Sequence, residues 1–326
     1  MLSPLNRSDN DLFRQARQGE RLTPIWLVIP LAFLIPLVSS LGSLPLLIFN
    51  AASRMPDLLA LLENDPASEI DQNAVLAMLL PQTALGYALF LILSFLGIYL
   101  LLWIWAHFFE KRSFRTLGFS SSNGWQKFGR GFLIGAFLFA IPVLVMVLVG
   151  FYVPAPNSTF DLSKIGTIGV VLLGWLVQGP AEELLFRGWV LPVTAARYRP
   201  VVGIGVSALL FGLLHLNNPN VSAIAVLNLF LFGLFAAFYS LAEEGIWGIC
   251  GLHAVWNWVQ GNIFGLEVSG LRPPGGSLLV LEEHGPDMIT GGAFGPEGGL
   301  MITLALIVAS GLLIWLSRWR TRRAQI

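Results

Sequence analysis

Eight long apolar segments constrain the fold of this chain more than any other feature. Each comes close to the roughly 20 residues that a helix needs to cross the hydrocarbon core of a bilayer. Several are apolar on all sides of a helix, and none alternates with the period of two that a membrane β-barrel strand requires. The segments cover 25–49, 80–108, 130–152, 167–190, 201–217, 221–241, 246–264 and 300–317. We therefore predict an all-α fold, a polytopic membrane helix bundle with about eight transmembrane helices.

The composition excludes the main soluble classes. Charged residues make up 12% of the chain and hydrophobic residues 55%, whereas about 25% of the residues in a soluble domain are charged. The 19 basic residues match the 19 acidic residues, so the basic excess of a nucleic-acid-binding protein is missing and no nucleic-acid partner is expected. The single cysteine, Cys250, excludes a disulfide framework and a cysteine-based zinc site.

The positions of the charges predict the topology. Eight spans with the N-terminus inside place five stretches in the cytoplasm, and these stretches with Arg130 and Arg187 hold 16 of the 19 basic residues. The stretches are 1–24, 109–129, 191–200, 242–245 and 318–326. The first and last outside loops are acidic instead, with Asp57, Glu63, Asp65, Glu69, Asp71, Glu282, Glu283, Asp287 and Glu297. This asymmetry follows the positive-inside rule and predicts that both termini are cytoplasmic.

A few polar residues lie inside the apolar segments, where each central charge costs about 2.5–3.5 kcal/mol. They come from three segments and are Glu182, Glu183, Arg187, His215, His253 and Asn257. Because this cost is reduced when such groups face one another, we expect them to share one internal site.

Local spacing refines this site. Glu183 and Arg187 are separated by four residues and can pair on one helix face. The Gly179-Pro180 dipeptide should kink or open the helix just before Glu182. Glu182 and His215 each lie 15 residues from the turn near Pro200, so both should be about 22 Å from it. His253 follows its own turn after only a few residues and should lie closer to the cytoplasm.

Three motifs resemble those of the CPBP family of CAAX proteases and bacteriocin-processing or Abi proteins. The segment Glu182-Glu183-Leu184-Leu185-Phe186-Arg187 resembles the family's EExxxR motif. Phe211 with His215 resembles its FxxxH motif, and His253 with Asn257 its HxxxN motif. The three occur in the family's order, and the resemblance covers roughly residues 165–265. The family often has Trp-Pro-Gly before the last histidine, whereas this chain has Ile246-Trp247-Gly248-Ile249.

The resemblance implies an intramembrane endopeptidase and gives roles to the residues. Glu182 would activate a water with help from His215, and His253 with Asn257 would donate to the oxyanion. Glu183 paired with Arg187 would hold the Glu182 carboxylate in place, and Phe211 would support His215. No cofactor is expected on this reading. The alternative is one zinc ion bound by Glu182, His215 and His253, because one glutamate and two histidines are a known zinc ligand set.

Four regions follow from these observations. They are a cytoplasmic N-terminal segment (1–24), three transmembrane helices with an acidic outside loop (25–164), a catalytic core of four helices (165–265), and an outside glycine-rich loop with a last helix and a basic tail (266–326). The glycine-rich stretch 290–299 is predicted to be a flexible loop. The expected partners are a peptide or membrane-protein substrate and the lipid bilayer, and the expected location is a bacterial inner membrane.

Two other functions use the same residues. A proteolytically silent member of the family would act as a membrane scaffold or bacteriocin-immunity protein. A proton-coupled transporter would use the carboxylates and histidines as a proton relay, although the chain shows no internal repeat of the kind many transporters have.

Overall fold

Helices account for 74% of the computed structural model, which describes residues 9–57, 59, 75, 78–156 and 158–323. The all-α class is therefore confirmed. Four acidic residues of the first outside loop lie outside the described residues: Glu63, Asp65, Glu69 and Asp71.

The first half of the chain forms an amphipathic surface helix and three long apolar helical segments. The second segment ends in a π-helical turn, η2. The elements are α1 (Asp11–Ala16), α2 (Ile25–Ser40), η1 (Leu41–Ser43), α3 (Leu44–Ser53), α6 (Ala84–Ile104), η2 (Trp105–Phe109), η3 (Phe114–Thr116) and α7 (Gly124–Leu148).

The second half contains the elements that carry the polar motifs. They are β1 (Tyr152–Pro154), η4 (Leu162–Lys164), α8 (Ile165–Glu183), the π-helix η5 (Leu184–Val190), α9 (Leu191–Arg197), α10 (Pro200–Leu214), α11 (Ala223–Glu243), α12 (Trp247–Trp258) and the π-helix η6 (Val259–Ile263). The C-terminal part adds β2 (Leu281–Glu283), α13 (Asp287–Thr290), η7 (Gly292–Phe294), η8 (Pro296–Gly298) and α14 (Leu300–Arg323).

Six helical segments among the described residues are long and apolar enough to cross a membrane. They are Ile25–Ser53, Ala84–Phe109, Gly124–Leu148, Leu162–Arg197, Ala223–Glu243 and Leu300–Arg318. The other two predicted spans are helical but shorter: α10 has 15 residues, and α12 has 12 residues before η6 continues it. At 1.5 Å per residue, α10 reaches only about 22 Å, less than the roughly 30 Å of a hydrocarbon core. The chain is therefore a multi-pass integral membrane protein, and the count of eight spans stays a prediction.

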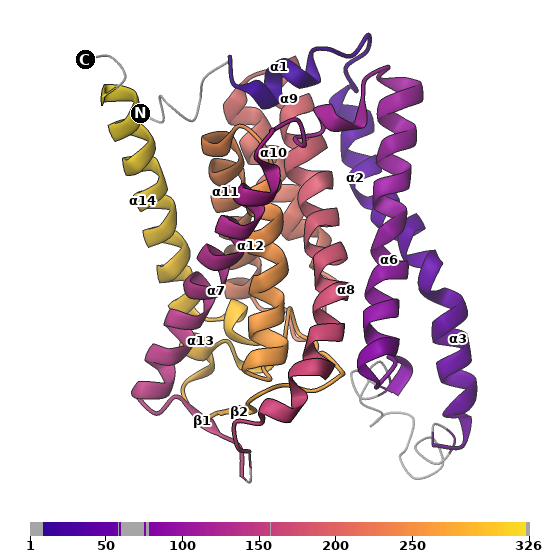
Figure 1. Ribbon diagram of the computed structural model, residues 1–326, viewed down its shortest axis with the longest axis vertical. Coiled ribbons are helices and arrows are strands. Elements are labelled where there is room, and N and C mark those ends of the chain that lie inside the picture. Colours follow the sequence, from indigo (N-terminus) through magenta and orange to yellow (C-terminus); the bar gives the residue numbers. More distant parts are fainter. Residues whose placement is uncertain (1–8, 58, 60–74, 76–77, 157, 324–326) are drawn as a thin grey trace.

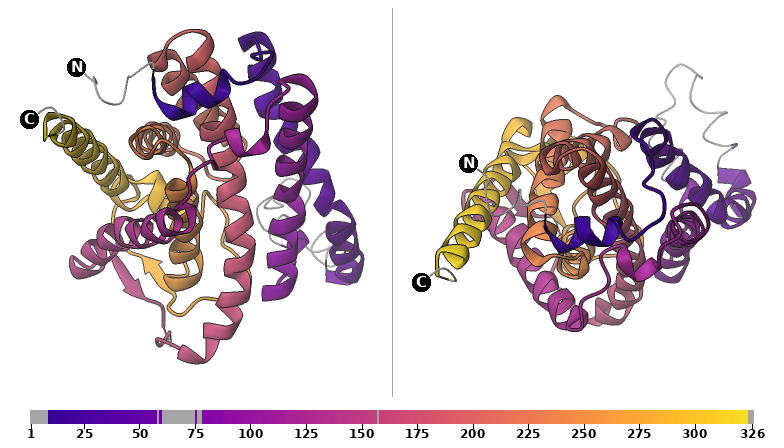
Figure 2. Two further views of the ribbon diagram at one scale, coloured as in Figure 1. Left: turned by 45° about the horizontal axis from the view of Figure 1, so that its top comes forward. Right: turned by 90° about the horizontal axis from the view of Figure 1, so that it is seen from above.

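The helix α12 occupies the middle of the bundle. It packs against α7 and α8, while α10 packs against α11 and α6 against both α2 and α8. Figures 1 and 2 show α2, α3 and α6 on one side of the bundle and α14 on the opposite side. Glycine allows α7 and α12 to approach closely, because a Cβ on Gly131 would lie 1.8 Å from the carbonyl oxygen of Gly248.

The two ends of the bundle differ in structure. Figure 1 shows α1, α9 and the C-terminal end of α14 at one end, with β1, β2 and α13 at the other. The two strands pair antiparallel, with Tyr152 opposite Glu283. Both ends of the described chain thus lie on the same side of the bundle, and the assignment of that side to the cytoplasm stays a prediction.

The glycine-rich stretch before α14 is ordered, so the prediction of a flexible loop is wrong. It forms α13, η7 and η8, and Thr290 and Phe294 are almost completely buried. Glycines with positive φ, such as Gly291 and Gly295, provide the tight turns between these short helices. The stretch therefore folds back against the helices and closes one end of the interior.

Candidate active site

The end of α8 places three charged residues in the interior. Glu182 is 5% exposed, and Glu183 and Arg187 are fully buried. The helix remains α-helical through Pro180 to Glu183 and becomes π-helical only at Leu184. The helix is therefore not opened at Gly179-Pro180, whereas a kink there stays a prediction. The π-helical segment begins directly after the two glutamates.

Glu183 connects Arg187 to His253. The Arg187 Nη1 atom lies 3.2 Å from Glu183 Oε1, which is the ion pair that the four-residue spacing predicts. The His253 Nδ1 atom lies 2.7 Å from the same Oε1 atom. Because a carboxylate only accepts hydrogen bonds, we assign the proton to Nδ1 of His253. This assignment directs Nε2 of His253 toward the neighbouring Glu182.

The Arg187 guanidinium is enclosed by aromatic rings. It lies 4.5 Å from the centroid of the Phe211 ring, and its Nη2 atom donates a 3.4 Å hydrogen bond to the carbonyl oxygen of Gly233. A buried cation needs such compensation because desolvation of a charge is costly. Phe211 thus contacts the charged pair as well as the neighbouring His215, whose ring centroid lies 4.8 Å away.

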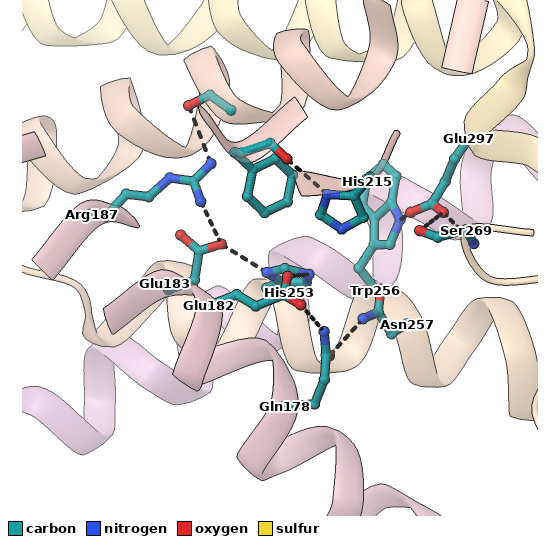
Figure 3. A network of polar contacts seen from close by, with 12 residues as sticks. Gln178, Glu182, Glu183, Arg187, His215, His253, Trp256, Asn257, Ser269 and Glu297 are labelled. Atoms are coloured by element: carbon teal, nitrogen blue, oxygen red, sulfur yellow. Dashed lines mark hydrogen bonds and ion pairs between the residues drawn. The ribbon is translucent and has the colours of Figure 1, made fainter. Parts of the chain in front are cut away.

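The Glu182 carboxylate faces a polar network on one side and a cavity on the other. Its Oε1 atom accepts a 2.8 Å hydrogen bond from Gln178, and Gln178 accepts one of 2.9 Å from Nδ2 of Asn257. Its Oε2 atom is buried without a hydrogen-bond partner among the described residues and lies 3.8 Å from Nε2 of His253. Figure 3 shows this network, with the side chains converging from α8 and α12.

The sequence predicted that His253 lies closer to the cytoplasmic end than the glutamates, and this prediction is wrong. The helix α12 begins inside the bundle, because Cδ1 of Ile246 lies 3.2 Å from the place that a Cβ on Gly188 would take. Six residues later His253 is beside Glu183. The correction follows from a helix that starts beside η5 rather than at the end of the bundle where α9 lies.

His215 lies at the C-terminal end of α10 in the same cavity. Its Nδ1 atom is 2.8 Å from the carbonyl oxygen of Phe211, which only accepts, so Nδ1 carries the proton and Nε2 is left for another partner. Among the described residues, the histidine closest to Glu182 is thus His253, whereas the sequence analysis paired Glu182 with His215.

These groups line one cavity of about 380 Å³. Its polar lining includes Gln178, Glu182, His215, His253 and Asn257, and much of the rest is aromatic or aliphatic. The apolar part comes from α2, α6, α8, α10, α11, α12 and α14, with residues such as Pro36, Tyr87, Phe90, Phe95, Trp175, Leu229, Trp256 and Ile302. The cavity has the size and mixed lining of a small-molecule or peptide site.

The close approach of α8 and α12 at the cavity depends on Gly179. A Cβ at this position would lie 2.8 Å from the backbone nitrogen of Ala254. A side chain there would push the two helices apart, and the distance between Glu182 and His253 depends on this contact.

Several residues of the cavity were not predicted from the sequence. Gln178 precedes Glu182 by four residues, a spacing that could have identified it. Glu297 and Ser269 were assigned to an outside loop, yet Glu297 accepts hydrogen bonds from Trp256 Nε1 (3.0 Å) and from Ser269 N (2.9 Å) and Oγ (2.8 Å). Nothing local in the sequence indicates this return of the loop to the cavity.

Within the described residues, no three histidine, cysteine, aspartate or glutamate side chains are placed so that they could hold a metal ion together. Binding of one zinc ion by Glu182, His215 and His253 stays an untested alternative.

Comparison with known proteins identifies the region that contains the site. None of the curated proteins and none of the solved structures matches the chain. Residues 164–259 match the model of one family, described as type II CAAX prenyl endopeptidase Rce1-like. The matched region includes Glu182, His215, His253 and Asn257. Residues 164–259, less than a third of the chain, are thus similar to the Rce1-like CAAX protease family.

Proposed function

We propose that this protein is an intramembrane endopeptidase in which Glu182 and His253 activate a water molecule. Glu182 lines the cavity, and the observation that carries the proposal is its buried Oε2 atom, which has no hydrogen-bond partner among the described residues and lies 3.8 Å from Nε2 of His253. The match to an endopeptidase family over the region that contains both residues supports it.

The geometry suits a water held by both side chains. A water oxygen can lie about 2.8 Å from both atoms at once, because their separation of 3.8 Å is less than twice a hydrogen-bond length. The water would donate one proton to each acceptor, so its lone pairs would face the cavity. Its oxygen then attacks the carbonyl carbon of the scissile bond while Glu182 takes the proton. The C–N bond breaks when this proton passes to the leaving amine.

Asn257 and His215 would stabilise the oxyanion in this mechanism. Asn257 uses one of its two N–H groups on Gln178, which leaves the second for the substrate. His215 in its protonated form would donate from Nε2. Donors fixed before the reaction in a water-poor cavity are among the largest contributions to acyl-transfer catalysis.

The supporting residues act on the orientation of His253. Arg187 fixes Glu183, and Glu183 fixes the proton of His253 on Nδ1. This differs from the role expected from the sequence, in which the Glu183–Arg187 pair held Glu182 directly.

The substrate is a peptide segment that enters the bundle from the membrane. The aromatic and aliphatic lining from α2 and α6 suits apolar residues next to the scissile bond, and the polar network of α8 and α12 lies at one wall of the cavity (Figure 3).

Cleavage of quenched peptides by the purified protein in detergent tests the proposal. Wild type is compared with Glu182→Ala, His215→Ala and His253→Ala, and with Glu282→Gln, which removes an exposed carboxylate on β2. We expect cleavage by wild type and Glu282→Gln, and losses of about 10²-fold or more for the cavity variants. Equal rates for all five proteins would refute the proposal.

The same preparation separates the alternatives. Loss of cleavage on chelation and its return with zinc would favour a metal-dependent mechanism. Ion-coupled flux in liposomes without cleavage would favour a transporter, and neither activity in a folded protein would favour a scaffold or immunity protein.

A further inference from the structure

The cavity has an unusual charge balance. Two carboxylates, Glu182 and Glu297, line it, and no lysine or arginine is among its lining residues in the described part of the chain. In Figure 3, Glu297 lies across the network from Arg187, beyond Trp256. The cavity is therefore acidic at two places.

Within the described residues, neither of these carboxylates has a lysine or arginine side chain within 4 Å, and the basic group near Glu182 is the imidazole of His253, whose Nε2 atom lies 3.8 Å from Oε2. Glu297 receives its hydrogen bonds from three neutral donors, the indole of Trp256 and the backbone and hydroxyl of Ser269. Glu182 receives one from the neutral amide of Gln178. Five carboxylates elsewhere in the described chain instead pair with an arginine: Asp11 with Arg14, Glu110 with Arg112, Glu183 with Arg187, Glu243 with Arg130 and Glu267 with Arg272.

Three donors also leave part of the Glu297 carboxylate free. An ionised carboxylate offers about four lone-pair directions, of which these bonds occupy three. The second acidic residue, Glu182, is 5% exposed. Its Oε2 atom has no hydrogen-bond partner among the described residues. A cation that entered the cavity would form charge-assisted hydrogen bonds and offset the cost of two desolvated negative charges.

We propose that the cavity binds its substrate through a lysine or arginine side chain that contacts Glu297. This inference rests on the proposed function, since it names the side chain that the endopeptidase would recognise. Trp256 contacts Glu297 and lies next to Asn257 on α12, so the basic residue would lie within a few residues of the scissile bond. The same charges disfavour a free C-terminal carboxylate in the cavity, so an internal peptide bond is the preferred substrate.

Peptides that differ in one side chain test this proposal. We would use N-acetylated, C-amidated quenched peptides with lysine, norleucine or glutamate at each position within four residues of the scissile bond. Norleucine keeps the apolar stem of lysine and removes its charge. We expect wild type to prefer lysine over norleucine at one position by about tenfold or more in kcat/KM, and glutamate to be the poorest.

Two variants separate the effect of the Glu297 charge from the effect of the hydrogen bonds that Glu297 accepts. Glu297→Gln removes the charge, and Ser269→Ala removes one donor to Glu297 but keeps the charge. We expect Glu297→Gln to cleave the lysine and norleucine peptides at rates within about twofold of each other, and Ser269→Ala to keep the preference. Equal cleavage of both peptides by wild type, or a preference that survives in Glu297→Gln, would overturn the inference.

A binding measurement keeps the inference separate from the proposed function. If wild type cleaves none of the peptides, the proposed function fails, and the affinity of the lysine and norleucine peptides is measured by tryptophan fluorescence, since Trp175 and Trp256 line the cavity. Tighter binding of the lysine peptide by about tenfold, lost in Glu297→Gln, would still support a cation site. Equal affinities would refute it.

Discussion

Substitution of Glu183 by glutamine should strongly destabilise the protein, because it leaves Arg187 as a buried cation without a counter-charge. Both side chains are fully buried, and their charged atoms are 3.2 Å apart. Breaking a buried ion pair by removing one partner costs about 3–5 kcal/mol. Folded proteins are stable by only about 5–15 kcal/mol, so Glu183→Gln should remove about a fifth or more of the free energy of unfolding.

The double variant Glu183→Gln/Arg187→Met provides the matched control. It removes both charges, and replacement of a whole buried pair by neutral groups is often close to neutral. We expect it to recover most of the loss, to within about 2 kcal/mol of wild type. Glu282→Gln, which changes an exposed carboxylate on β2, should stay within about 0.5 kcal/mol.

Reversible unfolding of the three variants in mixed micelles with increasing SDS measures these differences. If the free energy of unfolding of Glu183→Gln is within about 1 kcal/mol of the wild-type value, the burial of the Arg187 charge does not depend on Glu183. A double variant as unstable as the single one would show that the loss does not come from an uncompensated charge.

Of three further predictions, two concern the site and one concerns the end of the bundle near α1. Gly179→Ala should lower kcat by tenfold or more at nearly unchanged expression, because the added Cβ would lie 2.8 Å from the backbone nitrogen of Ala254. A misplacement of catalytic groups by 1 Å can lower the rate by about 10²-fold. An unchanged kcat would contradict the importance of this contact. Asn257→Ala should lower kcat by about 10²–10³-fold, the usual effect of removing one oxyanion donor, and a change confined to KM would argue against that role. Glu110→Gln should destabilise the end of the bundle near α1, because Glu110 and Arg112 are a buried ion pair 2.7 Å apart. We expect a protease to cleave the N-terminal segment of the variant faster than that of wild type, and equal cleavage rates would refute this prediction.

The parts of the fold predicted from the sequence are those with a strong local signal. Long apolar runs predicted the long helical segments, because the lipid selects for length and hydropathy within one segment, but they gave no sign of the short helices α1, α9 and α13. The helices α10 and α12 are apolar but shorter than the six long segments. Hydropathy alone therefore does not decide whether α10 and α12 cross the membrane.

The site shows the same division between local and long-range information. Spacing within one helix predicted the Glu183–Arg187 pair and could have indicated Gln178. The contact between Glu183 and His253 joins residues 70 positions apart, and its geometry depends on where α12 begins. Glu297 returns to the cavity from a loop whose glycine-rich composition suggested flexibility, because composition does not reveal that Thr290 and Phe294 pack inside.

The arrangement of the site also changes the expected roles of the two histidines. The sequence analysis paired Glu182 with His215, because the resemblance implied it and because both residues lie 15 positions from the same turn. The structure places His253 at 3.8 Å from Glu182 and leaves His215 with a contact to Phe211. The proposed water thus lies between α8 and α12 rather than between α8 and α10.

A double-mutant cycle on kcat tests the central claim most directly, that Glu182 and His253 act together on one water. The four proteins are wild type, Glu182→Gln, His253→Ala and the double variant, each checked for folding in the same detergent. Groups that act as a unit show strongly non-additive effects. The account predicts that each single variant loses about 10²–10⁴-fold and that the double variant loses no more than the worse single one. Losses that multiply in the double variant would show that the two side chains act independently and would contradict the account.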